Sequence, residues 1–525
     1  MNLLAALLGA TLISVSGNDA SLLLAKHTQY VGWQAGDPSV QGWNASGTRT
    51  NGHVTDTFAE KRSGVAYRDT LTAAGGRVSI QMGFTGTMIW QSDPNGFMVK
   101  ESGIPAQVAY DLNLIRAETL GSVSDLTITG SAQVRGVNTT ILHVNPSPVA
   151  PPMDVYEDPN TGAFLQAIVD PVGPARTVVS IDAYSDATAG KKAVTQWTIG
   201  AMQYTLTSIS TAHIADTDLI APAPTATWTF GDQTVPVDLF DLSAGTHRYQ
   251  PRVNLTVNGV TGVFVLDTGT QSIVLFGNFA GRAGVIAIDG ADFSPFAGNP
   301  RYQGYGLVQT LTAGNSTLHN VMVDRIADPN NRIAGLLGYD FYAGVIAEID
   351  LSSRRMQLFN PATVQPAVAP GGFAFPIDLT SHRPVIGMRL SGKANGFPYF
   401  STGEPYFMLL SQRLRESGAV SASDMSTEHF NPSSGRSGFF GTMIESDPVQ
   451  LGYSDYTGAY GVGNCVLLNE ALIGPYRYQS PPLCFVGSGV FGEDGGAIGN
   501  DFLRHFDWTI DYPDGKFVLT PNNLP

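Results

Sequence analysis

The sequence Val-Phe-Val-Leu-Asp-Thr-Gly-Thr at residues 263–270 decides the fold. Its four large apolar residues predict a buried β-strand, and Asp267 stands where that strand ends. Gly269 allows the backbone to turn sharply there, and the hydroxyls of Thr268 and Thr270 can hold the turn. The acid is therefore expected in a fixed position at a strand end rather than on a loose loop.

The same pattern occurs a second time downstream. Pro251 opens the first copy and Pro384 the second, and each is followed by a strand, a tight Gly turn, a second strand and a Thr-Gly loop. In the second copy this loop reads Ser-Thr-Gly-Glu at residues 401–404, and its distance from the opening proline differs by one residue. An internal repeat of this kind predicts a duplicated architecture.

The two copies also end alike. The first contains Gly335-Leu-Leu-Gly338 and the second Gly496-Ala-Ile-Gly499, each followed by a β-type segment with Ile-Asp. Two matched signals in the same order predict that the Thr-Gly loops meet across a pseudo-two-fold axis. Two acids placed there would share one proton, so that the pair could deprotonate a water while protonating a carbonyl oxygen.

The strand, the Asp-Thr-Gly triplet and the later Gly segment resemble the aspartic peptidase superfamily, specifically its retropepsin-like branch. The resemblance extends over about residues 229–524 and to the bacterial two-lobe forms. It implies an all-β bilobal fold, a substrate cleft between the lobes and peptide hydrolysis by an activated water, without metal, cofactor or covalent intermediate. Asp267 would be the general base, Thr268 and Gly269 would support its loop, and Thr270 would donate to its outer oxygen.

The second copy departs from the family pattern at its first loop position. Ser401 stands where the family has its second aspartate, although Thr402 and Gly403 retain the partner loop. Losing half of a general acid/base pair costs about 10²- to 10⁴-fold in rate. The first loop has an acid at its first position and a hydroxyl at its fourth, and the second loop has the reverse. One hypothesis is therefore that Glu404 reaches the space that the missing second aspartate would fill. The alternative is a solvated Glu404 in a degenerate lobe.

The predicted function is therefore an aspartic-type endopeptidase, with activity reduced or altered by Ser401. The alternative is an inactive relative that binds peptides or an envelope protein in its cleft. A third possibility is a carrier role set by the amino-terminal region alone. The partner is expected to be a polypeptide, and the chain a monomer, because the fused second copy occupies the face through which one-lobe relatives pair.

Length and composition set the domain plan. A chain of 525 residues predicts several domains, and the Ala-Pro-Ala-Pro segment at residues 221–224 indicates a boundary. The plan is a signal peptide at 1–16, a β-rich accessory domain at 17–228, lobe 1 at 229–362 and lobe 2 at 363–525. The net charge of −15 disfavours nucleic acid as a partner.

The accessory region reads as short β-type runs with little helical periodicity, for example at 78–82, 86–90, 125–129 and 178–183. Residues 83–91 and 156–162 resemble, more faintly, the β half-barrels that precede retropepsin-like units in some exported bacterial proteins. Half-barrels of this sort bind lipids or substrate segments in a concave apolar face.

The apolar run at residues 3–15 reads as a signal-peptide core, which predicts export to the periplasm or the extracellular space. No later stretch approaches the ~20 apolar residues of a membrane span. In an oxidising compartment Cys465 and Cys484 could form a disulfide bond. The alternative, two buried free thiols, is equally compatible with the sequence. The sequence has no two His residues three or four positions apart and no His-Glu-x-x-His motif, so it does not predict a zinc site.

Overall fold

In a computed structural model the chain is described over residues 17–33, 37, 42–52, 54–146, 151–172, 176–188, 190–241, 249–288, 293–297, 299–327, 333–392, 394–404, 407–418, 420–425, 450–454, 460–486 and 495–524. The structure is mostly β, which confirms the predicted all-β class. The chain divides into two compact units, with Met1–Asp93 and Lys100–Pro222 in unit 1, and Pro94–Val99 and Ala223–Pro525 in unit 2. The predicted signal peptide at 1–16 lies outside the described residues.

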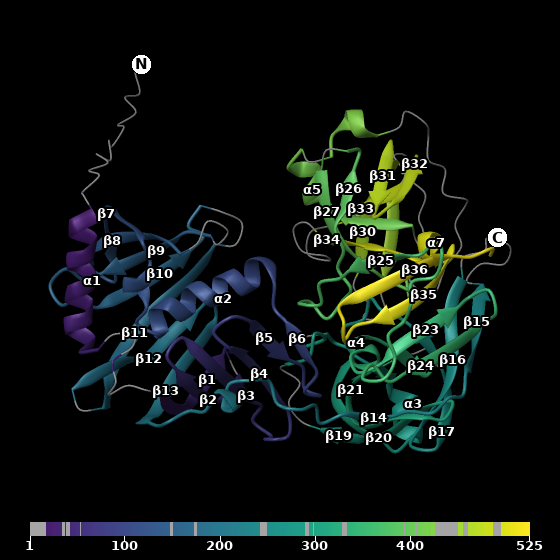
Figure 1. The fold of residues 1–525 in the computed structure, drawn as a ribbon, viewed down its shortest axis with the longest axis horizontal. Coiled ribbons are helices and arrows are strands. Elements are labelled where there is room, and N and C mark those ends of the chain that lie inside the picture. The colour runs from purple at the N-terminus through teal and green to yellow at the C-terminus, as the bar shows by residue number, and fades with distance from the viewer. Residues whose placement is uncertain are drawn as a thin grey trace. The chain divides into compact units, whose positions relative to one another are not determined.

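Unit 1 is built on a sheet that has thirteen strands among the described residues, in the order β6-β5-β4-β3-β2-β1-β13-β12-β11-β10-β9-β8-β7 (Figure 1). Of the edge strand β6, only Lys100 belongs to unit 1. Strands adjacent in sequence pair with one another except β6 and β7, which lie at the two edges, and β1 pairs with β13 in the middle of the sheet. The strands are β1 (Trp43–Asn51), β2 (Val54–Ser63), β3 (Ala66–Thr72), β4 (Ser79–Phe84), β5 (Ile89–Ser92), β6 (Met98–Lys100), β7 (Asp125–Val134), β8 (Val137–Asn145), β9 (Met153–Glu157), β10 (Phe164–Val169), β11 (Thr177–Thr188), β12 (Lys191–Ile199) and β13 (Met202–Thr211).

Two helices accompany this sheet, α1 (Gly17–Val31) and α2 (Gly103–Arg116), with short 3-10 turns η1 (Leu120–Ser122) and η2 (Asp216–Asp218). The prediction of little helix in the accessory region was wrong for α2. This helix contacts β5 and β10 and buries Leu114 and Ile115, so packing against the sheet stabilises a segment of modest intrinsic propensity. The predicted strand at 86–90 is also displaced, because Gly86 has φ +96° in a turn and β5 begins only at Ile89.

Unit 2 contains the duplicated pattern as matching strand pairs. Strands β16 (Tyr249–Val257) and β17 (Val260–Leu266) form a hairpin, and so do β26 (Met388–Leu390) and β27 (Ala394–Phe400). The first hairpin turns through two residues of positive φ, Asn258 and Gly259, as a two-residue hairpin requires, and Ser391 and Gly392 in the turn of the second also have positive φ. In each copy the second strand then pairs in parallel with the later Gly-containing strand, β22 (Gly335–Leu337) or β34 (Gly495–Ile498).

The strands of unit 2 form two sheets. One has fourteen strands, in the order β19-β20-β21-β18-β22-β17-β16-β15-β24-β23-β35-β36-β25 with β14 paired to β21, and the other has the order β29-β30-β33-β28-β34-β27-β26-β31-β32. The remaining elements are β14 (Thr227–Thr229), β15 (Val235–Asp241), β18 (Val274–Phe276), α3 (Gly277–Arg282), β19 (Ile286–Ile288), β20 (Tyr302–Ala313), β21 (Ser316–Ile326), α4 (Tyr339–Tyr342), β23 (Ile346–Asp350), β24 (Arg355–Phe359), β25 (Phe373–Pro376), β28 (Met408–Ser411), α5 (Arg413–Glu416), η4 (Ala422–Asp424), β29 (Gln450–Ser454), β30 (Tyr460–Leu467), β31 (Glu470–Ile473), β32 (Tyr476–Gln479), β33 (Pro482–Val486), α7 (Asn500–Leu503), β35 (Phe506–Asp511) and β36 (Lys516–Pro521).

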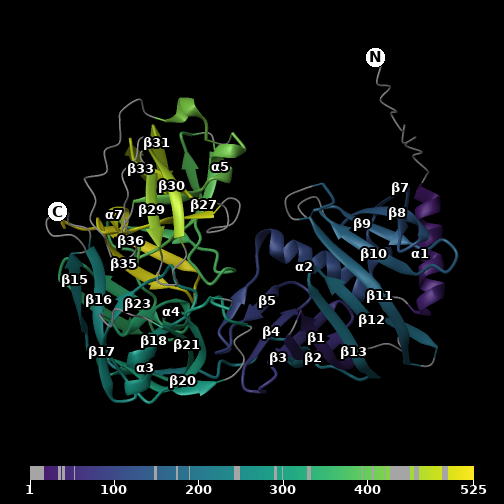
Figure 2. The ribbon, with the colours of Figure 1, turned by 180° about the vertical axis from the view of Figure 1, so that it is seen from behind.

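A single apolar core joins the two copies. Phe264 and Leu266 of the first copy belong to the same buried cluster as Phe400 and Ile498 of the second. Val265 faces the opposite side of β17, into a smaller buried cluster. Both faces of β17 are thus covered, which explains its uninterrupted apolar sequence. Strand β35, near the end of the second copy, pairs with β23, near the end of the first, and Figures 1 and 2 show the two strands side by side.

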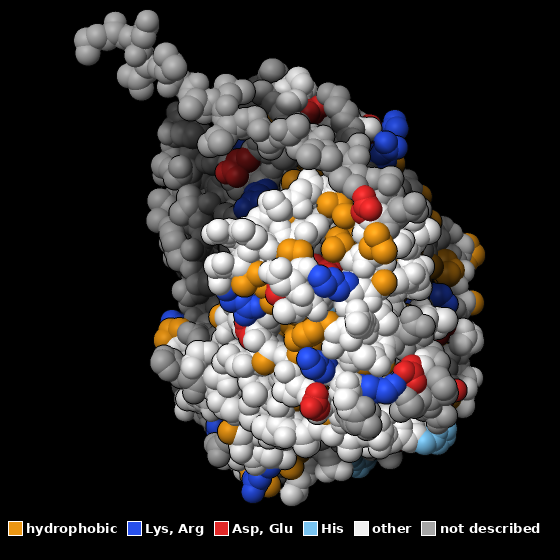
Figure 3. Space-filling view, turned by 90° about the vertical axis from the view of Figure 1, so that its left-hand side faces the viewer, with side chains coloured by type: hydrophobic (Ala, Val, Ile, Leu, Met, Phe, Trp, Pro, Cys, Tyr) orange, Lys and Arg blue, Asp and Glu red, His pale blue; other side chains and the backbone are white. Residues whose placement is uncertain are grey.

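The face drawn in Figure 3 carries Lys and Arg side chains interspersed with Asp and Glu, and its hydrophobic side chains lie in small separate groups. Among the described residues, no helix has the length and apolarity needed to cross a bilayer.

Candidate active site

Asp267 lies at the end of β17, as predicted. Its backbone N–H donates to Leu337 O at 3.0 Å, which ties the acid to the neighbouring strand β22. Its side chain is 6% exposed and accepts two hydrogen bonds from its own loop. Gly269 N donates to Oδ1 at 3.0 Å, and Thr270 Oγ1 donates to Oδ2 at 2.7 Å. The carboxyl is thereby fixed in orientation as well as in position.

Ser401 occupies the equivalent place in the second copy. Its N–H donates to Ile498 O at 2.9 Å, and its own carbonyl accepts from Glu404 N at 3.3 Å. In the first copy the Asp267 carbonyl accepts from Thr270 N in the same way, at 3.1 Å. The two loops therefore share one backbone conformation although their first residues differ in chemistry.

The central threonines of the two loops exchange hydrogen bonds. Thr268 N donates to Thr402 Oγ1 at 3.0 Å, and Thr402 N donates to Thr268 Oγ1 at 3.1 Å. Each hydroxyl then donates onward to the opposite copy, Thr268 to Phe400 O at 2.8 Å and Thr402 to Leu266 O at 2.7 Å. Both side chains are fully buried. The predicted partner loops are thus brought together and joined by a reciprocal set of four bonds.

The two loop glycines leave room for the opposing side chains. A Cβ on Gly403 would collide with the carboxyl group of Asp267. A Cβ on Gly269 would collide with Ser401 Oγ and would lie 3.2 Å from Asp267 Oδ1. The acid of one copy and the hydroxyl of the other therefore face each other across the junction, each packed against the glycine of the opposite loop.

Burial raises the pKa of Asp267 above its usual value. Hydrogen bonds from Thr270 and Gly269, the positive charge of Arg383 and a backbone hydrogen bond from Gly403 each oppose that rise. The Arg383 Nε donates to Gly269 O at 2.8 Å, and its guanidinium lies 4.8 Å from the ring of Tyr399. The sequence did not indicate this residue, although it immediately precedes the proline that opens the second copy.

An aromatic cluster lies near the acid. The carboxylate of Asp267 adds to burial in raising the pKa values of Tyr342 and Tyr512. Tyr339 stacks on Tyr512, with ring centroids 5.9 Å apart, and contacts the ring of His382 at 4.5 Å. Burial and the charge of Arg383 lower the pKa of His382 to about 4, so this imidazole is neutral near pH 7. The aromatic groups of this cluster are uncharged near pH 7, and Arg383 supplies the positive charge that acts on Asp267.

Glu404 corresponds in position to Thr270, the residue that donates to Asp267. Its carbonyl accepts from Asn500 N at 2.7 Å, just as the Thr270 carbonyl accepts from Tyr339 N at 3.0 Å. The side-chain oxygen Oε1 of Glu404 is buried. The residue as a whole is half-buried, and its exchange of roles with Thr270 stays a prediction.

The Gly segments pass close to other strands. A Cβ on Gly335 would collide with Val274 O, one on Gly338 with Thr270 O, and one on Gly496 with Leu409 O. The fourth, Gly499, precedes α7 with the same extended conformation that Gly338 has before α4. The first three positions therefore require glycine because of close backbone approach.

The two cysteines lie opposite each other on neighbouring antiparallel strands, Cys465 in β30 and Cys484 in β33. Cys484 takes part in a disulfide bond. Within the described ranges, no three His, Cys, Asp or Glu side chains gather as a metal site would require.

Comparison with known proteins identifies the class of this region. Residues 253–341 match a family model described as aspartyl protease. That stretch runs from β16 into α4 and includes the Asp267 loop and the first Gly segment. The match supports an aspartyl protease-like domain over these residues.

No curated protein matches the chain. Among solved structures, this chain is similar to a DUF1329 family protein from Desulfovibrio piger ATCC 29098, at 11% sequence identity and a TM-score of 0.29. The match covers 39% of this chain and 96% of that one.

Proposed function

We propose that this chain is a single-chain, two-lobe relative of the retropepsin-like peptidases, and that it hydrolyses peptide bonds with one carboxyl, Asp267. The observation that carries the proposal is the reciprocal bonding of Thr268 and Thr402, at 3.0 and 3.1 Å. These bonds hold the loop of the buried Asp267, which lies in the region that matches aspartyl proteases, against the Ser401 loop, which lies outside that region.

A single carboxylate can carry the proton transfers of the reaction. Ionised Asp267 accepts a proton from water while the water oxygen bonds to the peptide carbonyl carbon. The resulting tetrahedral intermediate collapses as Asp267 returns this proton to the leaving nitrogen and the C–N bond breaks. Ser401 orients the water by hydrogen bonding. The carboxylate is regenerated, and no cofactor is consumed.

Ser401 makes this enzyme slower than one with two acids. A hydroxyl does not supply a proton to the carbonyl oxygen as a carboxyl does, so developing negative charge is less well stabilised. The expected loss is about 10²- to 10⁴-fold in turnover.

Glu404 is the candidate that would recover part of this loss, because its carboxylate belongs to the same loop and is at least partly buried. Glu404→Gln is then expected to lower turnover by more than about tenfold. A Glu404→Gln variant as active as the wild type, in an enzyme that Asp267→Asn abolishes, would show that Glu404 takes no part.

The proposal is tested with denatured casein as substrate, from about pH 3 to pH 7, with and without a statine-type inhibitor. Cleavage that the inhibitor blocks and that Asp267→Asn abolishes supports the peptidase. Asp378→Asn is the matched control, because Asp378 also lies in unit 2 but outside the two loops. Cleavage that persists in Asp267→Asn would overturn the proposal.

The second candidate function is peptide binding without hydrolysis, and the serine in place of an acid favours it. It predicts no cleavage at any pH but binding of a statine-type peptide that weakens in Asp267→Asn.

We further propose that the protein is exported and acts as a monomer on polypeptides. The disulfide at Cys484 supports an oxidising compartment.

A further inference from the structure

We propose that unit 1 binds a small neutral amphiphile, whose apolar part is about the size of one ring and whose hydroxyl donates a hydrogen bond to Asp69. This site lies wholly within unit 1 and does not depend on the peptidase proposal.

The site is a cavity of about 130 Å³ between α2 and the sheet. Ile115 of α2 lines it together with Leu71 of β3, Val179 of β11 and Trp197 of β12. Strands far apart in the sheet order thus line one space, because the sheet curves around the helix. An apolar cavity of about 150 Å³ in another protein takes up benzene, so a ring-sized apolar group suits this volume.

One wall favours an aromatic occupant. Trp197 and Tyr204 stack with ring centroids 4.9 Å apart and nearly parallel planes, and Phe58 meets both rings edge-on, at 5.9 and 5.6 Å. All three side chains line the cavity. Rings prefer other rings as edge-to-face or offset stacked neighbours, so a wall rich in aromatic side chains suits an aromatic occupant.

Asp69 provides the polar end of the cavity. Its side chain is 5% exposed, and its Oδ2 accepts from Arg116 Nη1 at 3.3 Å. The other oxygen, Oδ1, is buried, and no described residue donates to it. Burial raises the pKa of this carboxyl to about 7, which reflects the poor solvation of its charge. Asp69 lines the cavity, and its carboxyl accepts one long hydrogen bond from a described residue, so a hydroxyl that enters the cavity supplies a second donor to it.

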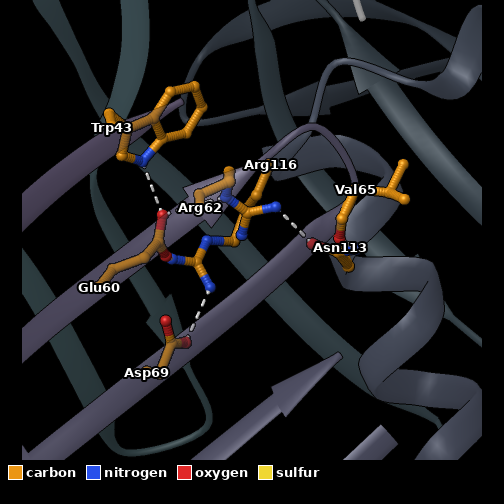
Figure 4. A network of polar contacts seen from close by, with 7 residues as sticks. All are labelled: Trp43, Glu60, Arg62, Val65, Asp69, Asn113 and Arg116. Atoms are coloured by element: carbon orange, nitrogen blue, oxygen red, sulfur yellow. Dashed lines mark hydrogen bonds and ion pairs between the residues drawn. The ribbon is translucent and has the colours of Figure 1, made fainter. Parts of the chain in front are cut away.

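The charge network around Asp69 selects a neutral ligand (Figure 4). Arg116 also forms an ion pair with Glu60, and Glu60 Oε1 accepts from Arg62 Nε at 3.0 Å and from Trp43 Nε1 at 2.8 Å. Two acids therefore face two guanidinium groups. A charged ligand would unbalance this network in a site with little water, whereas a hydroxyl adds a donor without adding charge.

The same network keeps Asp69 in place without a ligand. Arg62 Nη1 donates to Asn113 Oδ1 at 2.6 Å, and Asn113 Nδ2 donates to Val65 O at 2.7 Å, which ties α2 to the β2–β3 turn. The guanidinium of Arg116 lies 4.6 Å from the ring of Trp197. The carboxyl is thus positioned before a ligand arrives, which lowers the entropic cost of binding.

The test compares two probes of nearly equal size, benzyl alcohol and toluene, titrated into the full-length protein by ligand-observed NMR. At pH 8, where Asp69 is mostly ionised, wild type is expected to bind benzyl alcohol at least about tenfold more tightly than toluene, because a hydrogen bond to a charged group is worth that much. Asp69→Asn is expected to reduce the affinity for benzyl alcohol about tenfold and to leave the affinity for toluene unchanged.

Two further variants make the test specific. Asp56→Asn is the matched control and should preserve the preference. Asp56 is a buried acid on β2, paired with Arg49 of β1, and it does not line the cavity. Ala109→Phe fills the cavity from α2 and should abolish binding of both probes.

Equal affinity of wild type for the two probes would overturn the proposal, and so would an unchanged preference in Asp69→Asn or binding that survives Ala109→Phe. If Asp69→Asn fails to fold, the wild-type preference and Ala109→Phe decide the question by themselves.

Discussion

Asp267 and Ser401 occupy equivalent backbone positions in the two copies, and their N–H groups donate equivalent hydrogen bonds, to Leu337 O at 3.0 Å and to Ile498 O at 2.9 Å. The asymmetry of the site is therefore confined to side chains. The second loop thus keeps the backbone conformation of the first, and the two loops differ at this position only in that a hydroxyl replaces a carboxyl group.

The reciprocal threonine bonds should contribute measurably to stability. Thr402→Val removes the donor to Leu266 O and the acceptor of Thr268 N while keeping the side-chain volume. The free energy of unfolding is expected to fall by about 1–3 kcal/mol, measured by urea denaturation. Thr261→Val, at an exposed position on β17, should change it by less than about 0.5 kcal/mol. Equal effects of the two changes would contradict the structural role of the exchange.

Arg383 should set the pH range of activity. Its positive charge favours the ionised form of Asp267 and so opposes the rise in pKa that burial causes. A general base works only when ionised, so activity is lost as pH falls through its pKa. Arg383→Gln is expected to raise that pKa and to move the acidic limb of the pH profile of casein cleavage to higher pH, whereas Arg383→Lys should move it less. A limb unchanged in Arg383→Gln would rule out this role.

Asp111 of α2 should make stability depend on pH. Both its carboxylate oxygens are buried without a partner among the described residues, and burial raises its pKa to about 7. The folded state then binds a proton more tightly than the unfolded state, so this group lowers stability as pH rises from about 4 to 7.

Asp111→Asn is therefore expected to stabilise the protein by about 1–3 kcal/mol at pH 8 and to change little near pH 4. Thermal unfolding at the two pH values measures this effect. Asp125→Asn, an exposed acid on β7, serves as the control and should alter neither melting temperature. Destabilisation by Asp111→Asn at pH 8 would show that the carboxylate has a partner that the protein needs.

Local sequence was enough to predict the two loops. A run of large apolar residues followed by Asp-Thr-Gly encodes a strand, its end and a turn within a few positions, and the repeat supplied the partner loop. Arg383 and Tyr512 could not be found in this way, because they reach the site only through packing of segments distant in sequence. The all-β class was likewise predictable from alternating β-type runs.

In unit 1 the charged side chains were the harder problem. Glu60 and Arg62 lie on β2 at alternate positions with Phe58, and this alternation places all three on the buried face. Charged residues are buried only when paired, and the partners Asp69 and Arg116 come from β3 and α2, whose packing a single sequence does not reveal. The two-residue alternation with Phe58 was the one local signal of their burial.

The most direct measurement of the central claim is the rate of casein cleavage by Ser401→Asp. If Asp267 and residue 401 share one water across joined loops, a second carboxyl restores the missing proton donor. Turnover should then rise by about 10²-fold or more, and the pH profile should change from a single rising limb to a bell. A folded Ser401→Asp variant that cleaves no faster than wild type at any pH would contradict the assignment of this junction as a proteolytic site.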